Sequence, residues 1–287
     1  MAVILSERAE VRRDARLRPR RLAGRRPALA AALDRTRRSI GQVALFAVFG
    51  IGGATIGALV VPLCSVFVRD PVRRADGVRS VVYHFLRAYV GGMQALQLID
   101  LEVIGLDRPL PPGSLIVANH PSLIDALILL GRIKGGVVVA KRSLQISPFT
   151  GGGIRGANYI VNADPVGLVD ECRARIAAGE TLVLFPECTR TAADGVIRLR
   201  RGAAQIAVRS GCPMIPLTIE FSEPLLDKQS RWWLAPRVKP RVRVVRHEPI
   251  DPAEFVRGHR SVTLVARRLT EHLQAFYVKE LTRRGPA

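Results

Sequence analysis

The sequence predicts an α/β protein: a mixed, largely parallel sheet flanked by helices and preceded by an N-terminal pair of membrane-associated helices. From Leu101 onward, short apolar runs alternate with helical patterns, as in parallel sheets covered by helices. Before that point, residues 43–68 carry no charged side chain, and about 20 apolar residues suffice to cross a bilayer. We therefore divide the chain into a basic arm expected to be disordered (1–38), a membrane-associated helical hairpin (39–100) and an α/β domain (101–287).

The arm holds a large share of the positive charge. Residues 1–38 contain twelve Arg against Glu7, Glu10, Asp14 and Asp34, a net +8 of the +20 carried by the whole chain. Basic residues near a membrane are each attracted to anionic headgroups by about 1 kcal/mol. A solvated tail without a partner is the equally weighted alternative.

The charge-free run is too long, and too far from the start, for a cleaved signal peptide, whose apolar region is about 7–15 residues. Its glycines and Pro62 favour a bend. A second, mostly apolar stretch runs from Val78 to Ile99. Because both flanks of the first run are basic, charge does not set a direction of crossing. We expect a bent hairpin that enters one leaflet and returns; a single span is the close alternative, and burial in a soluble core the third.

The elements of the domain follow from the same patterns. The strands are expected at Leu101–Ile104, Ser114–Ala118, Val137–Ala140, Tyr159–Val161, Thr181–Phe185, Met214–Phe221 and Val242–Arg246. The helices are expected at Ser122–Leu130, Val166–Ala178, Gly202–Arg209 and Ser261–Leu281. No internal repeat interrupts this order.

Composition narrows the class of protein. With 48% apolar and 24% charged residues the chain can bury a core, which excludes a disordered protein. A pI near 11.3 indicates an anionic partner: nucleic acid, acidic lipid, or a phosphorylated or carrier-bound substrate. Aromatic residues make up only 5% and the basic arm adjoins an apolar helix, so nucleic acid is not expected. The four Cys show no metal-binding spacing, so we expect reduced thiols and no metal.

Two polar clusters follow predicted strands, where α/β proteins usually place their sites. In the first, Asn119-His120-Pro121-Ser122-Leu123-Ile124-Asp125, His120 stands at the strand–helix junction and Asp125 lies about one turn into the helix. A bend there can bring the carboxylate to the imidazole and leave the other ring nitrogen as a general base. A capping histidine beside an unrelated first-turn Asp is the plainer alternative.

The second cluster is Leu184-Phe185-Pro186-Glu187-Cys188-Thr189-Arg190. A tight loop that offers backbone amides, a hydroxyl and a guanidinium suits a phosphate monoester. Taken singly, Arg190 could instead form a surface ion pair and Glu187 a structural one. The joint presence, order and separation of the two clusters favour a site.

These residues resemble the glycerolphosphate/lysophosphatidate acyltransferase superfamily. Its first block, asparagine-histidine-x4-aspartate, is similar to Asn119–Asp125, and its third, phenylalanine-proline-glutamate-glycine-threonine-arginine, to Phe185–Arg190. Its fourth, a proline-apolar-proline strand, is similar to Pro213–Pro216. The resemblance covers about residues 101–252. It implies transfer of an acyl chain from acyl-CoA or acyl carrier protein, as co-substrate, to a hydroxyl of a lysophospholipid-like acceptor in bacterial lipid metabolism.

Carried over residue by residue, the resemblance makes His120 the general base and Asp125 its orienting partner. It places Glu187, Cys188, Thr189 and Arg190 in acceptor binding or in support of the site, with no metal and no further cofactor. The expected partners are anionic membrane lipids, the acyl thioester and the lysolipid or other hydroxyl acceptor. The expected location is the inner membrane with the domain on the cytoplasmic face, where acyl thioesters are made.

Two departures from the pattern matter. Cys188 stands where the third block has glycine; an acylated Cys188 nucleophile is a minor alternative, because direct transfer needs no thiol. Asn162 stands where the second block has an arginine that binds the phosphate, and Arg155 is a candidate substitute for it. This weakens the case for a glycerophosphate acceptor. Aryl-polyene or ornithine-lipid acceptors, and a non-catalytic lipid-binding protein, remain alternatives. Arg231-Trp232-Trp233-Leu234 resembles an interfacial anchor, with packing in a small core as the alternative.

Overall fold

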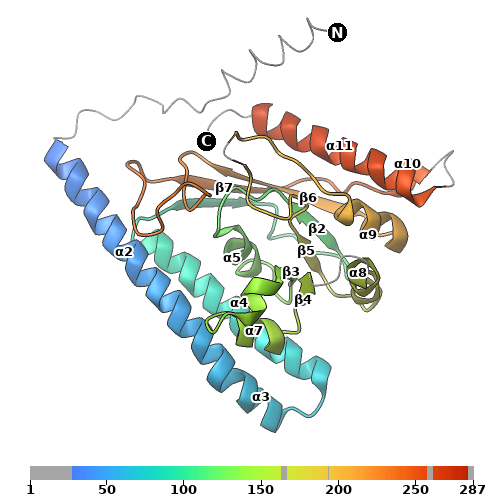
Figure 1. Cartoon of the computed structure of the whole chain (residues 1–287), viewed down its shortest axis with the longest axis horizontal. Coiled ribbons are helices and arrows are strands. Elements are labelled where there is room, and N and C mark those ends of the chain that lie inside the picture. The colour runs from blue at the N-terminus through green and yellow to red at the C-terminus, as the bar shows by residue number, and fades with distance from the viewer. Residues whose placement is uncertain (1–27, 163–166, 193, 257–260, 284–287) are drawn as a thin grey trace, which may run out of the picture.

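A seven-stranded sheet forms the centre of the computed structural model, which describes residues 28–162, 167–192, 194–256 and 261–283 (Figure 1). The strand order is β1-β7-β6-β2-β5-β3-β4, and every neighbouring pair is parallel except the antiparallel β6 and β7. The strands are β1 Asp100–Ile104, β2 Leu115–Ala118, β3 Val137–Lys141, β4 Ile160–Asn162, β5 Leu182–Leu184, β6 Met214–Phe221 and β7 Arg241–Arg246. The predicted mixed, largely parallel sheet is confirmed, and each strand lies within one residue of its predicted bounds.

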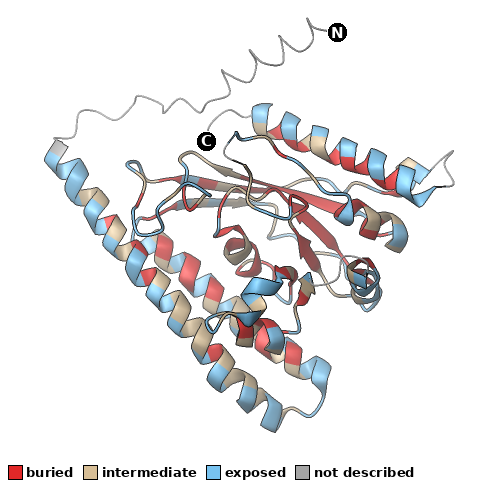
Figure 2. Cartoon of the chain, in the orientation of Figure 1, coloured by how far each residue is buried: buried red, intermediate tan, exposed pale blue. Residues whose placement is uncertain are grey.

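Helices cover both faces of the sheet (Figures 1 and 2). They are α5 Asp125–Leu130, α6 Arg142–Ile146, α7 Gly151–Gly156, α8 Gly167–Ala177, α9 Gly202–Ser210, α10 Ala253–Val256 and α11 Val262–Arg283. Side chains of β2 alternate between the two cores: Leu115 and Val117 pack with α8, α9 and α11, whereas Ile116 and Ala118 pack with α5 and the N-terminal helices. The short helices α6, α7 and α10 were not predicted, because so few residues show no periodicity.

The N-terminal hairpin begins earlier than predicted. Helix α2 spans Ala28–Thr55, a π-helical turn η1 follows at Ile56–Val60, α3 continues over Val61–Phe67, and α4 returns over Pro71–Ala95. The alanine-rich start of α2 favours helix, so residues 28–38, assigned to the arm, are helical. Residues 1–27 of that arm lie outside the described residues. Within the described part of the chain, Leu29–Phe67 is the one helix long and apolar enough to cross a membrane.

The glycines of this helix do not break it. The helix runs on through η1, whose wider turn lies just before Pro62, where the ring would otherwise clash with the carbonyl four residues back. A Cβ on Gly53 would lie 2.0 Å from the Phe149 carbonyl oxygen, and one on Gly57 would lie 2.9 Å from the Gly152 Cα. The glycines are therefore places where α7 and its approach pack directly against the backbone of α2 and η1.

One edge of the sheet gathers the ends of five strands. Because β2, β3, β4, β5 and β6 run parallel, their carboxyl ends all lie at this edge. Both predicted polar clusters follow two of these strands, β2 and β5. The loop of residues 222–240, which we call the β6–β7 loop, starts and ends at the same edge.

Candidate active site

The junction after β2 holds a histidine–aspartate pair. The Asn119 side chain donates to the Ile219 carbonyl and accepts from the Ile219 N–H, each at 2.8 Å, which fixes the end of the strand. His120 Nδ1 then lies 2.9 Å from Asp125 Oδ2, and the Ser122 N–H donates to the same oxygen at 2.7 Å. The predicted contact between imidazole and carboxylate is present. It occupies Nδ1, so Nε2 is the ring nitrogen left for chemistry.

Asp125 is fully buried at the start of α5. Burial raises the pKa of its carboxyl group to about 6, although the hydrogen bonds from His120 and Ser122 act in the opposite direction. Its second oxygen, Oδ1, is buried without a hydrogen-bond partner among the described residues. Above pH 6 the carboxylate is ionised and accepts the Nδ1 proton, which holds the imidazole in the tautomer with a basic Nε2.

Glu187 binds the backbone of His120. Its Oε1 accepts from the His120 N–H at 2.8 Å and from Thr191 Oγ1 at 2.9 Å, and the Thr191 N–H donates to the His120 carbonyl at 2.7 Å. The carboxylate is buried, and burial raises its pKa. Phe185 stacks on the imidazole with ring centroids 4.3 Å apart. These contacts join the loop after β5 to the loop after β2, so Glu187 is placed to position His120 rather than to face a substrate.

Cys188 and Thr189 are exposed beside this pair. Cys188 has φ +58°, the left-handed conformation that suits the glycine of the family block. Protein packed around one side of the thiol raises its pKa, an effect that Arg200 and Lys141 oppose. A raised pKa disfavours the thiolate that a nucleophile needs.

Arg190 is half-buried, and its Nη1 donates to the carbonyls of Leu226 and Asp227, both at 2.8 Å. The sequence associated this guanidinium with the acceptor; in the structure it binds the β6–β7 loop. Ser122 Oγ also donates to that loop, at 2.6 Å from the Leu225 carbonyl. The loop is therefore fastened to the site at two adjacent points.

Lys141 is a further candidate site residue, which the sequence motifs did not single out. It ends β3 at the sheet edge that carries both polar clusters, is exposed, and pairs in register with Asn162, the residue that replaces the expected arginine. Arg155, the suggested substitute, lies in α7 and donates to the Gln145 carbonyl at 2.8 Å. Because Lys141 directly follows the apolar run Val137–Ala140, the rule that found the two clusters would also have found it.

Arg200 is a second cation near the catalytic loop. Its N–H donates to the Pro186 carbonyl at 2.7 Å, and its charge acts on the Cys188 thiol, as that of Lys141 does. Lys228 likewise acts on the Glu187 carboxylate. Cations from three separate segments thus act on the loop after β5, at Cys188 and Glu187.

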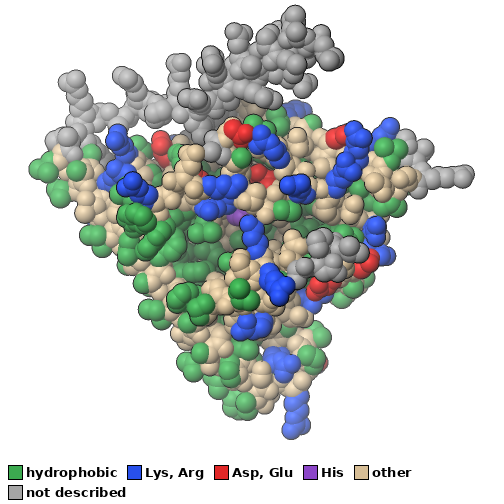
Figure 3. All heavy atoms as spheres, viewed as in Figure 1, with side chains coloured by type: hydrophobic (Ala, Val, Ile, Leu, Met, Phe, Trp, Pro, Cys, Tyr) green, Lys and Arg blue, Asp and Glu red, His purple; other side chains and the backbone are tan. Residues whose placement is uncertain are grey.

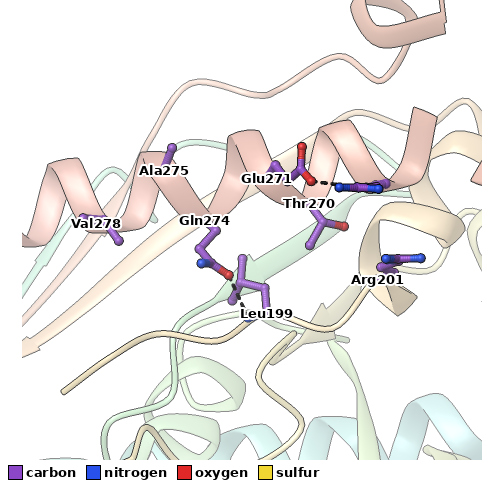
Figure 4. A pocket seen from close by; sticks show the side chains of 8 residues that line it. Leu199, Arg201, Thr270, Glu271, Gln274, Ala275 and Val278 are labelled. Carbon is purple, nitrogen blue, oxygen red and sulfur yellow. Dashed lines mark hydrogen bonds and ion pairs between the residues drawn. The ribbon is translucent and has the colours of Figure 1, made fainter. Parts of the chain in front are cut away.

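Other polar groups lie away from this site. His247 Nε2 lies 2.9 Å from Thr218 Oγ1, but Thr218 is fully buried, so this pair holds β6 and β7 together and offers no access to a substrate. A surface groove runs between α11 and residues 199–201 (Figure 4). The Arg267 guanidinium there is paired with Glu271 at 2.9 Å, and none of the six predicted site residues lines the groove.

The chain matches an acyltransferase family model over residues 101–220, which includes both polar clusters. It is 24% identical to the chloroplast 1-acyl-sn-glycerol-3-phosphate acyltransferase of Brassica napus, an alignment covering 69% of this chain and 58% of that protein. It is 26% identical to 1-acyl-sn-glycerol-3-phosphate acyltransferase alpha of Ovis aries, covering 65% of each. The chain spans about half the length of the curated plant and algal relatives it matches.

A solved structure agrees with these matches. The 1-acyl-sn-glycerophosphate acyltransferase PlsC of Thermotoga maritima superposes with a TM-score of 0.64 at 27% identity. The superposition covers 86% of this chain and 98% of that one, so it extends beyond the residues of the family model. Together with the family model and the named relatives, this shows that the chain belongs to the glycerolphosphate acyltransferase superfamily.

Proposed function

We propose that the protein transfers a fatty acyl chain from a thioester to the free hydroxyl of a lysophosphatidate-type acceptor. The observation that carries this proposal is the His120–Asp125 pair. The buried carboxylate places Oδ2 2.9 Å from the histidine Nδ1, at the sheet edge where the five parallel strands end. The imidazole keeps 18% of its side-chain surface accessible, so a substrate hydroxyl can reach it.

In this mechanism His120 Nε2 takes the proton of the acceptor hydroxyl as its oxygen attacks the thioester carbonyl carbon. The tetrahedral intermediate collapses, the C–S bond breaks, and the imidazolium gives its proton to the leaving thiolate, which departs as the free thiol. Asp125 holds the ring and stabilises its positive charge between these steps. General acid–base catalysis of this kind contributes about 10²–10⁴-fold to the rate.

The charge around the pair favours a phosphorylated acceptor. Lys141, Arg200 and Lys228 come from three segments, and their charges act on Cys188 or Glu187 in the loop after β5. The relatives named above are 1-acylglycerol-3-phosphate acyltransferases, which agrees with an acceptor that carries a phosphate. In this proposal Lys141 supplies the charge that Asn162 lacks.

The hairpin is proposed to lie on one leaflet of the inner membrane, with the domain on the cytoplasmic side. Helix α2 contacts the domain at Arg35, whose Nε donates to the Ala235 carbonyl, and the same continuous helix still contacts it at Val61, beside Gly156. Twenty-six residues of helix extend about 39 Å, more than the roughly 30 Å hydrocarbon core of a bilayer. A membrane-crossing helix would draw these parts of the domain into lipid. The outward face, with exposed Ile40, Ile51 and Phe67, can instead enter one leaflet.

The test is an acyl-transfer assay on the purified full chain in mixed micelles. Labelled acyl-CoA and acyl carrier protein are offered with lysophosphatidate, glycerol-3-phosphate or lyso-ornithine lipid. We expect transfer to lysophosphatidate, a loss of at least about 100-fold in His120→Ala, and no loss in His272→Ala, an exposed histidine of α11. Equal rates in wild type and His120→Ala would refute the mechanism. Reporter fusions after Ile99 that were active only outside the cytoplasm would refute the topology.

A further inference from the structure

The β6–β7 loop carries both tryptophans of the chain on its surface. Trp232 and Trp233 are 48% and 49% exposed, and Leu234 and Val238 beside them are exposed as well. The indole rings meet edge to face at 5.7 Å. The sequence left open that the two tryptophans pack in a small core, but about half of each side chain is exposed.

Helix α2 holds this part of the loop in place. Gln42 Nε2 donates to the Trp232 carbonyl at 2.6 Å, and Ser39 Oγ accepts from the Ala235 N–H at 3.0 Å. Arg38, which is almost fully buried, donates to the Arg237 carbonyl at 2.9 Å. These contacts to the loop backbone fix its path. The Trp232 ring also packs on Phe46 of α2, with ring centroids 5.3 Å apart, and about half of each indole side chain stays exposed.

The other end of the loop is held by the site. Ser122 and Arg190 bind the carbonyls of Leu225, Leu226 and Asp227, as described above. The loop therefore extends from the histidine–aspartate pair to the most apolar helix of the protein. Any surface that binds the two indole rings is held at a fixed place relative to His120.

The chemistry of the patch fits the interface of a bilayer. An indole ring combines a large apolar body with an N–H donor, and tryptophan is enriched at the level of lipid headgroups. The loop contains four basic residues against Glu223 and Asp227; the basic ones are Lys228, Arg231, Arg237 and Lys239. Hydrophobic side chains gather along α2 and over the adjoining front of the domain (Figure 3). The patch thus continues the apolar surface of the hairpin and adds positive charge suited to anionic lipid.

We propose that Trp232 and Trp233 enter the lipid–water interface of an anionic bilayer and fix the height of the His120 site above it. This rests on the proposed function of a membrane-bound acyltransferase. It adds a second contact, on the catalytic domain itself, to the contact made by the hairpin. The acceptor lipid would then be taken from the bilayer at a defined distance from Nε2.

The chain reports on this patch directly, because its only two tryptophans lie there. The full chain is mixed with vesicles of phosphatidylcholine and phosphatidylglycerol, with or without bromine on the acyl chains, and binding is followed by co-sedimentation. We expect the tryptophan emission to shift to the blue on binding and to be quenched by brominated lipid. Co-sedimentation with unchanged emission would overturn the proposal while leaving membrane binding intact. Absence of co-sedimentation would overturn both. A blue shift that depends on protein concentration without vesicles would assign the patch to a second copy.

A variant separates interface binding from folding. Trp233→Ala is expected to weaken vesicle binding about tenfold, from the half ring no longer buried in lipid. Transfer to a vesicle-borne acceptor should fall in parallel, whereas transfer to a short-chain soluble acceptor should not change. Leu264→Ala, an exposed apolar position on α11, is the matched control and should bind like wild type. Equal losses with both acceptors would show a structural role and overturn the proposal.

Discussion

Cys188 allows the strain and the chemistry of the catalytic loop to be tested in one residue. Its φ of +58° lies in the left-handed region, which costs a residue with a Cβ about 1–2 kcal/mol. Glycine avoids that strain but loses about 0.5–1 kcal/mol more backbone entropy on folding. The side chain is exposed, and its Sγ makes a long contact, 3.9 Å, with the Pro186 carbonyl. Cys188→Gly should therefore stabilise the folded protein by about 0.5–1 kcal/mol.

The assay measures stability and activity on the same preparation. For a large domain, 1 kcal/mol shifts the melting temperature by about 2–4 °C, so we expect a rise of about 1–3 °C. We expect kcat/KM to stay within about threefold of wild type, because direct transfer does not use the thiol. Cys188→Ser is the control: it keeps a Cβ at the same φ, so it should retain activity without the rise in melting temperature.

Two results would refute this reasoning. Loss of activity of about 100-fold or more in both variants, with unchanged folding, would make the thiol part of the chemistry and restore the acylated-cysteine mechanism. A fall in melting temperature of Cys188→Gly would show that the loop does not store the strain inferred from its backbone.

Substitutions of Asp125, Lys141, Glu187 and Gly53, with matched controls, test the remaining parts of the structure. Asp125→Asn should lower kcat about 10³-fold, because the amide cannot stabilise the imidazolium. Burial raises the Asp125 pKa from its ordinary value of 3.8 to about 6. Protonation of this carboxyl group therefore stabilises the folded state by about 3 kcal/mol below pH 3.8, and this stabilisation is lost as the pH rises through 6. Asp125→Asn should therefore be at least as stable as wild type at pH 7.5, and a lower melting temperature there would contradict the assignment; wild-type activity should also fall on acidification near pH 6. Lys141→Ala should raise KM for lysophosphatidate about tenfold with kcat less affected, whereas Lys134→Ala, an exposed lysine preceding the opposite end of β3, should change neither. Glu187→Gln removes a buried charge but keeps an oxygen that accepts hydrogen bonds from His120 and Thr191, so it should retain most activity. Glu187→Ala should lose activity. Equal loss in both variants would assign the carboxylate a charge-dependent role. Gly53→Ala, which brings a Cβ to 2.0 Å from the Phe149 carbonyl, should destabilise the protein by about 1–3 kcal/mol, and Gly91→Ala, with open space around it, should stabilise α4 slightly in the same melting assay.

Local patterns were sufficient for much of this fold. The seven strands follow from short apolar runs. The central strands β2 and β5 are buried at every position and need apolar side chains throughout, whereas β1 and β7 alternate between more and less exposed side chains. The contact between His120 and Asp125 also depends on neighbours in sequence: five residues and one strand–helix bend bring the groups together. Where two interacting residues are only a few positions apart, as here, the local sequence was enough to predict their contact.

The hairpin shows where such reasoning stops. A glycine in an apolar helix either permits a bend or lets another backbone approach, and the choice depends on what packs against it. For Gly53 and Gly57 the partner is the segment that contains Phe149 and Gly152, almost one hundred residues further along the chain. Arg190 poses the same problem, because the two carbonyls that it binds belong to a loop 36 and 37 residues away. Tertiary neighbours, which no local pattern specifies, determined both outcomes.

The two departures from the family pattern show what each position of the site requires. Cys188 stands in place of a glycine yet adopts the left-handed backbone that suits glycine, so the loop after β5 makes this turn at the cost of some strain. Asn162 replaces a cation, but Lys141 lies opposite it in the β3–β4 register, so positive charge remains at the same edge of the sheet. In the first case the fold enforces a conformation, and in the second it draws the charge from a neighbouring strand. What the site needs is a left-handed turn and a positive charge at this edge of the sheet, and the particular residue in each block matters less. A phosphorylated acceptor is therefore compatible with this chain despite Asn162.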